Sequence, residues 1–353
     1  MIDFFIKVKQ QESQNLPFVI YRKPSKTKLI GLFQKNDHLY FAEDFKETGF
    51  VFAPFNGNQN ILIPKKESVL WEAELTAFKG NCDANIEYPE NNKDQEHFES
   101  LVQKGVDATA SGVFKKVVLS RKEIIDLPNF DLVSVFKKLI YSYPDAFCYC
   151  WYHPKIGLWI GATPERLLKA SKKKFFTMAL AGTQNYEDTI DVAWEKKEIE
   201  EQQFVTDFIL DNIKTLTREV AISSPYTLKA GGVLHIKTDI EGKLNKDSNM
   251  KQVVSVLHPT PAVCGLPKES SRNFILENEK YDREYYTGFL GEINKKEFSK
   301  DTSKTDLYVN LRCMQITNKE AHLYVGCGIT KDSIPENEWK ESVNKSMTMK
   351  RVL

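Results

Sequence analysis

Two pairs of glutamates have a spacing that could hold a divalent cation. Glu198 and Glu201 are three residues apart, and Glu338 and Glu341 repeat this spacing in a second segment. Residues three apart on a helix share a face, and like charges stacked in this way destabilise the helix unless a cation neutralises them. Carboxylate oxygens are hard ligands of the kind that Mg²⁺ prefers. Glutamates at this spacing are also ordinary on solvated helix faces, so the pairs alone leave both interpretations open.

A lysine, a glutamate and a histidine could move protons. Lys116 follows Lys115 at the start of an apolar, strand-like run, and strand side chains alternate, so one of the two lysines must point toward the core side. A lysine stripped of water can act as a base, although lysines at strand edges commonly stay in solvent. Glu165 follows Pro164 in a glycine-containing turn, where it could donate a proton or face solvent. His235 lies in another apolar run, and its default interpretation is a core histidine with its hydrogen bonds satisfied.

Other residues could bind an anion. Arg312 stands in an otherwise apolar run, and a buried guanidinium needs a carboxylate or phosphate partner. Gly326 and Gly328 would let backbone amides approach an anion closely. Lys345 follows Glu341 by four residues, which is also the spacing of an ordinary surface ion pair.

The apolar periodicity predicts interspersed strands and helices. Strands are expected over 18–21, 29–33, 49–52, 61–64, 116–121, 147–152, 156–161, 174–181, 233–238, 286–293, 306–317 and 321–329. Helices are expected over 97–110, 130–142, 190–217, 247–257, 268–278 and 335–350. The polar segment 89–96 is interpreted as a surface loop rather than a domain boundary. Neighbouring strands look like hairpins, so an α+β fold with mostly antiparallel sheets is expected rather than a doubly wound parallel sheet.

Taken in order, nine runs closely resemble the chorismate-utilising enzymes, the group that contains isochorismate, salicylate, anthranilate and aminodeoxychorismate synthases. The runs are KVVLSR (116–121), GATPE (161–165), ALAGT (179–183), EIEEQQF (198–204), HPTPAVCGLP (258–267), DREYYTGFLG (282–291), LRC (311–313), GCGI (326–329) and EWKESVNK (338–345). Each run alone is weak, but nine in this order over about residues 115–350 are very specific.

The resemblance implies one large domain over residues 1–353, with antiparallel sheets packed as a sandwich and helices outside. Residues 1–95 would be a variable part, and 96–353 the part that bears the catalytic motifs. Glu201 and Glu341 would hold Mg²⁺, with Glu198 and Glu338 supporting them directly or through water.

The resemblance also implies roles around the substrate chorismate. Lys116 would be the general base and Glu165 the general acid, and His235 would line the ring. The implied substrate-binding positions are Thr183, Ala262, Val263, Arg312, Gly328 and Lys345.

Two positions indicate water as the nucleophile. Ammonia-using members of the family carry glutamine where Lys116 stands, or lysine where Ala181 stands. Salicylate synthases typically have Thr-Ala where this chain has Ala262 and Val263, whereas isochorismate synthases have alanine and a bulky aliphatic residue. We therefore expect conversion of chorismate to isochorismate, by addition of water at C2 and loss of the C4 hydroxyl. Salicylate synthase activity is the alternative. The product would feed menaquinone or siderophore biosynthesis.

The bulk composition favours an ordinary globular protein. The net charge is only +1, from 49 basic and 48 acidic residues, so nothing favours binding to nucleic acid or a membrane surface. No stretch approaches the ~20 apolar residues of a spanning helix, and the first residues do not resemble a signal peptide. The six cysteines include no CxxC pair and are expected to be reduced. We expect a cytoplasmic monomer without a glutaminase partner.

Overall fold

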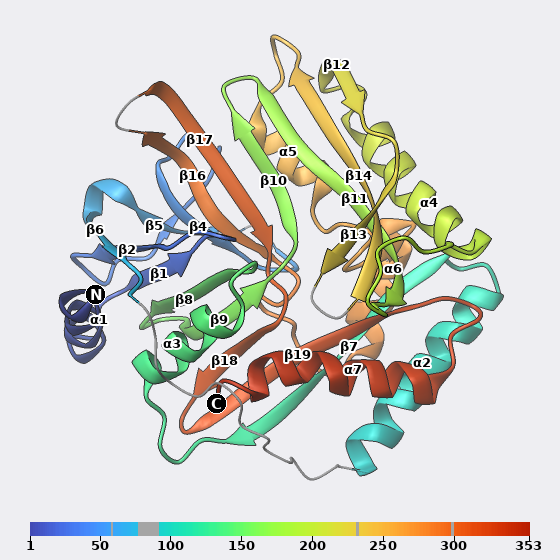
Figure 1. Ribbon diagram of the computed structural model, residues 1–353, viewed down its shortest axis with the longest axis horizontal. Coiled ribbons are helices and arrows are strands. Elements are labelled where there is room, and N and C mark those ends of the chain that lie inside the picture. The colour runs from blue at the N-terminus through green and yellow to red at the C-terminus, as the bar shows by residue number, and fades with distance from the viewer. Residues whose placement is uncertain (58, 77–91, 231–232, 298–299) are drawn as a thin grey trace.

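Two antiparallel sheets form the body of the molecule (Figure 1). The computed structural model describes residues 1–353 apart from 58, 77–91, 231–232 and 298–299. Sheet A has the order β15-β7-β19-β18-β9-β8-β1-β2-β6. Its strands are β1 (Phe18–Arg22), β2 (Lys28–Gln34), β6 (Ser68–Glu74), β7 (Lys116–Asp126), β8 (Phe147–His153), β9 (Gly157–Thr163), β15 (Gly265–Leu266), β18 (Cys313–Thr317) and β19 (Glu320–Ile329).

Sheet B has the order β12-β14-β11-β10-β17-β16-β4-β5-β3, with β13 also paired to β14. Its strands are β3 (Tyr40–Phe41), β4 (Gly49–Ala53), β5 (Ile61–Pro64), β10 (Arg166–Ser171), β11 (Lys174–Asn185), β12 (Thr217–Ile222), β13 (Tyr226–Ala230), β14 (Val233–Leu244), β16 (Phe289–Glu297) and β17 (Lys300–Val309). The first part of the chain supplies strands to both sheets, so it shares their cores rather than packing separately.

Aromatic side chains from both sheets meet between them. Phe147 of sheet A stacks on Tyr308 of sheet B with ring centroids 4.2 Å apart, and Trp151 packs on Phe52 at 4.6 Å. All four are at most 1% exposed. Such ring pairs contribute about 0.5–1.5 kcal/mol each beyond the burial of their area. These contacts hold the two sheets face to face as a sandwich.

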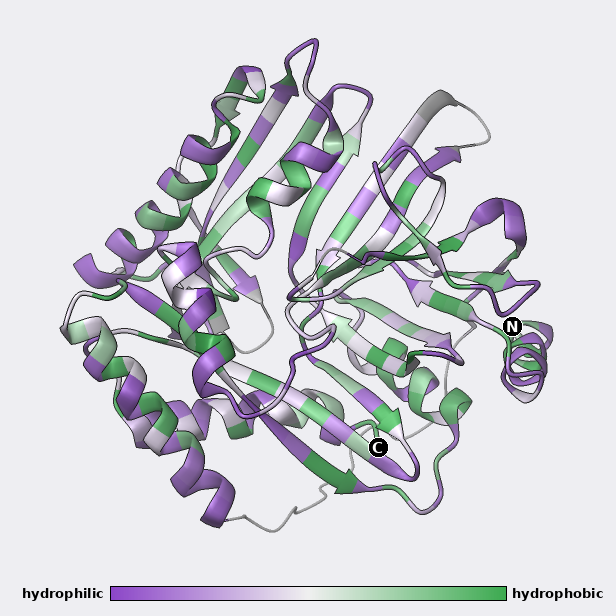
Figure 2. Cartoon of the chain, turned by 180° about the vertical axis from the view of Figure 1, so that it is seen from behind, coloured by the Kyte–Doolittle hydropathy of each residue, from purple (hydrophilic) through white to green (hydrophobic). Residues whose placement is uncertain are grey.

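Helices cover the outer faces. α1 (Ile2–Ser13) and α3 (Leu132–Ser142) pack on sheet A, and α4 (Lys196–Ile213) and α5 (Met250–Leu257) pack on sheet B. α2 (Asn92–Ala110), α6 (Lys268–Asn278) and α7 (Pro335–Lys350) cover β7 and β19. Figure 2 shows apolar residues alternating with hydrophilic ones along these elements, as expected when each buries one side. None of the described helices is both long and apolar enough to cross a membrane.

The structure confirms the α+β sandwich of antiparallel sheets with helices outside, and several predicted elements differ. Residues 2–13 form α1, because Phe4, Phe5 and Val8 recur on one face and become buried; no helix was predicted there. The second half of the polar segment 89–96 belongs to α2, while residues 89–91 lie outside the described residues. Helix α4 is shorter than the predicted 190–217, and the largely exposed strands β12 and β13 that follow it were not predicted.

The largest difference concerns the predicted strand 306–317. It is two strands in different sheets, β17 ending at Val309 and β18 beginning at Cys313. Arg312 lies between them with a φ of 47°, a left-handed conformation that interrupts extended chain. The apolar run therefore carries the chain from one sheet to the other.

Candidate active site

The crossing between the sheets positions Arg312 and Glu165 together. The carbonyl of Arg312 accepts a hydrogen bond from the backbone N–H of Ala162 (3.0 Å), and the carbonyl of Glu165 accepts one from Val309 (3.0 Å). The hydroxyl of Thr163 donates to the Val309 carbonyl at 2.6 Å. The turn that bears the predicted acid and the loop that bears the predicted anion-binding arginine therefore hold each other.

Glu165 has the environment of a weak acid. Its side chain is partly buried, and desolvation raises its pKa to about 7, against the opposing effect of the positive charge on Lys116. A carboxyl with this pKa is partly protonated at neutral pH and can donate a proton. Because the charge of Lys116 acts on this pKa, the side chains of Lys116 and Glu165 lie near each other.

Lys116 is the lysine that points inward. Its side chain is 15% exposed, and its Nζ lies 2.5 Å from Oε1 of Glu201. The neighbouring Lys115 is turned away, with its Nζ 4.2 Å from the centre of the Phe204 ring. Lys116 lies over Gly328 of the adjacent strand, where an added Cβ would be 2.7 Å from its Cε. The glycine therefore makes room for the lysine.

A bulge in β11 connects Glu201 with His235. The ladder between β11 and β14 shifts register between Ala181 and Gln184, which frees Gly182 from strand pairing. The Gly182 N–H then bonds Glu201, and its carbonyl lies 2.8 Å from Nδ1 of His235. Burial lowers the pKa of His235, so this side chain is neutral near pH 7. His235 is thus fixed by the same residue that fixes a predicted metal ligand.

Two cations and a carboxylate lie close together at α7 and the loop before β18: Lys345, Arg312 and Glu341. Nζ of Lys345 lies 2.5 Å from Oε1 of Glu341 and donates to the carbonyl of Gly326 at 2.9 Å. The guanidinium of Arg312 donates to the Lys345 carbonyl at 3.3 Å, which occupies one of its five N–H groups. Burial lowers the pKa of Arg312, and the nearby Glu341 opposes this effect. A partly buried guanidinium of this kind favours an anionic ligand.

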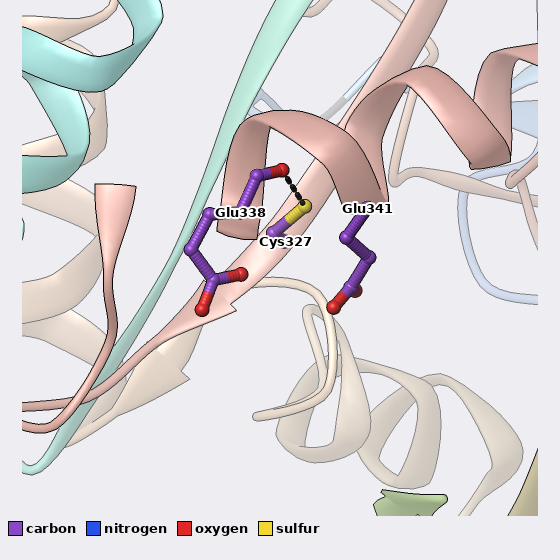
Figure 3. A group of neighbouring side chains, drawn as sticks. All are labelled: Cys327, Glu338 and Glu341. Carbon is purple, nitrogen blue, oxygen red and sulfur yellow. Dashed lines mark hydrogen bonds between the residues drawn. The ribbon is translucent and has the colours of Figure 1, made fainter. Parts of the chain in front are cut away.

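Two glutamates and a thiol form a group that could hold a metal (Figure 3). Ligand atoms of Cys327, Glu338 and Glu341 lie within 4.8 Å of one another, and Sγ of Cys327 donates to the Glu338 carbonyl at 3.3 Å. Burial raises the pKa of Glu338, and repulsion from Glu341 raises it further. A cation would relieve both effects. The described chain thus brings one of the two predicted glutamate pairs into metal-binding range.

The other predicted pair lies outside this group. Glu201 forms an ion pair with Lys116. Burial raises the pKa of Glu201, but the positive charge of Lys116 lowers it more, so the pKa lies below its ordinary value. Oε2 of Glu198 is buried and has no hydrogen-bond partner in the structure. An orphaned carboxylate oxygen is costly unless a cation or water binds it. The donor set of hard oxygens fits Mg²⁺, although the four glutamates do not surround one point in the structure.

The remaining predicted substrate positions differ in accessibility. Thr183 is exposed and its hydroxyl lies 3.2 Å from Nδ1 of His235. Ala262 is partly exposed, whereas Val263 is 2% exposed and packs in the apolar core of sheet B. Sequence reasoning gave no role to Cys327, although its place between two glycines of the GCGI run marks it as close to the site.

The site contains a weak acid, a lysine, a neutral histidine and the partly buried cations Arg312 and Lys345, which suit an enzyme for a small anionic substrate. A family model described as chorismate binding enzyme matches residues 60–353. The chain therefore belongs to the chorismate-binding enzyme family, as its motifs predicted. It is similar to isochorismate synthase EntC of Escherichia coli strain K12, with 27% identity over 293 residues that cover 80% of this chain and 73% of that protein.

Further similarities show how broad this family is. The chain is 27% identical over 273 residues to anthranilate synthase component 1 of Lactococcus lactis, covering 74% of this chain and 58% of that protein. The solved structure of MenF, the menaquinone-specific isochorismate synthase of Escherichia coli, superposes with a TM-score of 0.78 at 20% identity, covering 96% of this chain and 89% of that one. At this identity the superposition shows a shared fold.

Proposed function

We propose that this chain is an isochorismate synthase, an isomerase that converts chorismate to isochorismate with Mg²⁺. The observation that carries the proposal is the pairing of Glu165, a partly buried carboxyl with a pKa of about 7, with Lys116, a lysine whose charge acts on it. Addition of water and loss of a hydroxyl need a base and an acid at one site. Relatives named isochorismate synthase, at 27% and 30% identity, support this choice.

The charges around the site suit a dianion. Chorismate bears two carboxylates, and Arg312, Lys345 and the backbone of Gly328 would bind one of them by charge-assisted hydrogen bonds. The carboxylates of Glu201 and Glu341 would hold Mg²⁺, with Glu198 and Glu338 in support. Bound Mg²⁺ would neutralise the ring carboxylate of the substrate.

The proton movements follow from the positions of the two titratable side chains. Water attacks C2 while Lys116 takes one of its protons, and the ring double bonds shift. The C4–O bond breaks as Glu165 gives its proton to the departing hydroxyl, which leaves as water. The substrate gains one water and loses one, so the product is an isomer. His235, neutral and fixed by Gly182, would line the ring and keep it oriented.

One requirement follows from the ion pair between Lys116 and Glu201. Nζ of Lys116 lies 2.5 Å from Oε1 of Glu201, and this contact must open before Nζ can take a proton from water. Glu201 must therefore release Lys116 when the base acts, which is consistent with the role of Glu201 as a metal ligand.

Incubation of the purified protein with chorismate and Mg²⁺, followed by chromatography and NMR, tests the proposal. Isochorismate as the main product is expected. Salicylate with pyruvate would instead identify a salicylate synthase; Val263, slightly smaller than the leucine usual in isochorismate synthases, is the residue that makes this the second candidate. An aminated ring formed with ammonia or glutamine would contradict water as the nucleophile.

A further inference from the structure

The DREYYTGFLG run contains an arginine that is buried next to the site rather than in it. Arg283 is 2% exposed and forms a double ion pair with Glu279, from Nε to Oε2 at 2.7 Å and from Nη2 to Oε1 at 2.6 Å. Both residues follow or end α6. Neither touches the predicted acid, base or metal ligands, so the pair is free to have another role.

The pair completes the open edge of strand β7. The neighbouring strand β15 has only two residues, which pair with Lys116 and Val117. Beyond it, the carbonyl of Val118 accepts from Nη2 of Arg283 at 2.7 Å, and the N–H of Ser120 donates to Oε1 of Glu279 at 2.7 Å. These are the backbone groups that a longer β15 would have bonded. A donor and an acceptor side chain thus take the place of a missing strand.

The same guanidinium also holds the segment that leaves the edge of the sheet. Nη1 of Arg283 donates to the carbonyl of Val263 at 3.0 Å, while the Val118 N–H donates to the Cys264 carbonyl at 2.8 Å. One planar group therefore bonds the strand of Lys116 and the segment of Ala262. Because its donors have fixed directions, it sets the separation of these two walls.

We propose that Arg283 and Glu279 are positioning residues that fix Lys116 relative to the segment around Ala262. The inference rests on the proposed function only in that Lys116 is the base. A side chain with one ammonium cannot bond Glu279, Val118 and Val263 in the same directions. A change in this pair should therefore move the base relative to the ring without removing any group that binds the substrate.

The test compares Arg283→Lys with Arg22→Lys as a matched control. Arg22 is also 2% exposed and donates to the backbone carbonyls of Tyr143 and Pro144, but it lies in β1, away from the site. Arg283→Lys should lower kcat at least about tenfold while KM for chorismate changes less than about threefold, since small displacements of reacting groups cost rate rather than binding. Arg22→Lys should lower Tm to a similar extent and leave kcat unchanged.

Crystal structures of the same proteins give a readout that does not depend on activity. In Arg283→Lys, residues 260–264 should be displaced from β7, and the inference is wrong if this segment and kcat both stay as in the wild type. Equal losses of kcat in both variants would show a general effect of stability and would also overturn it. If Arg283→Lys does not fold, Glu279→Gln serves in its place. The product of the wild type tests the proposed function separately, because the ratio of kcat values can be measured for whichever chorismate product forms.

Discussion

The protonation of Glu165 should govern the rate at high pH. Burial raises its pKa to about 7, so the carboxyl holds its proton below this pH and loses it above. A general acid acts only when protonated and a base only when unprotonated, so kcat/KM for isochorismate formation should fall about tenfold per pH unit above the higher of the two groups' pKa values. A pH–rate profile of the wild type measures this fall. A profile without any falling limb at high pH would show that the reaction does not need this proton.

Lys116→Gln should abolish the addition of water while the protein stays folded. The amide cannot take a proton from water, and loss of a general base costs roughly 10²–10⁴ in rate. The amide can still bond Glu201, so Tm should change little. Lys115→Gln is the matched control, because that side chain is exposed and lies against Phe204. Normal turnover by Lys116→Gln would refute the role of base.

At the level of single residues, the sequence predicted which side chains share a face of a strand or helix, but not which partners they contact. Alternation along the strand shows that either Lys115 or Lys116 faces inward, and only the motif pointed to the second. The helical spacing places Glu198 and Glu201 on one face, but it could not show that they have different partners. Glu201 binds Lys116 from a strand of the other sheet, whereas Oε2 of Glu198 has no partner. Such differences depend on contacts between elements distant in sequence.

At the level of elements, the sequence did not predict that the chain crosses from one sheet to the other between Val309 and Cys313. Apolar residues continue through 306–317, so the pattern predicts one strand. The strand ends because Asn310 forms hydrogen bonds with other elements instead of a neighbouring strand. Its side chain accepts from the hydroxyl of Tyr149 at 2.6 Å and donates to the carbonyl of Tyr285 at 2.8 Å. The helices and most strands were predictable, because each buries one face with its own period. The site lies where these periodic patterns are interrupted.

Gly328→Ala tests how strand β19 makes room for the base. The new Cβ would lie 2.7 Å from Cε and 3.2 Å from Nζ of Lys116, so the end of this flexible side chain must move. We expect kcat to fall roughly tenfold or more, with a loss of folding stability below about 1 kcal/mol. Gly105→Ala is the control, because its Cβ would meet Leu119 at 2.8 Å, away from the proposed base. A Gly328→Ala variant with full activity would contradict the placement of Lys116.

At the scale of the whole molecule, the predicted metal ligands lie on helices that cover two different sheets. Glu198 and Glu201 belong to α4, which covers sheet B, and Glu338 and Glu341 belong to α7, which covers β7 and β19 of sheet A. The positive charge of Lys197 in α4 acts on the pKa of Glu338 in α7, so the two helices lie within electrostatic range of each other. A cation held between them would connect the two sheets, and its binding should therefore stabilise the whole fold.

Thermal unfolding with and without Mg²⁺ measures this link. A ligand that binds only the folded protein stabilises it by about 2.7 kcal/mol at one hundred times its Kd, so Mg²⁺ should raise Tm of the wild type and a chelator should reverse the rise. Glu341→Gln should lose most of the shift, because it removes a charged ligand. Glu336→Gln is the matched control: Glu336 lies on the exposed side of α7 and bonds Lys340 at 2.7 Å. It should keep the full shift. If Glu341→Gln responds to Mg²⁺ as strongly as Glu336→Gln, the cation does not bind between α4 and α7.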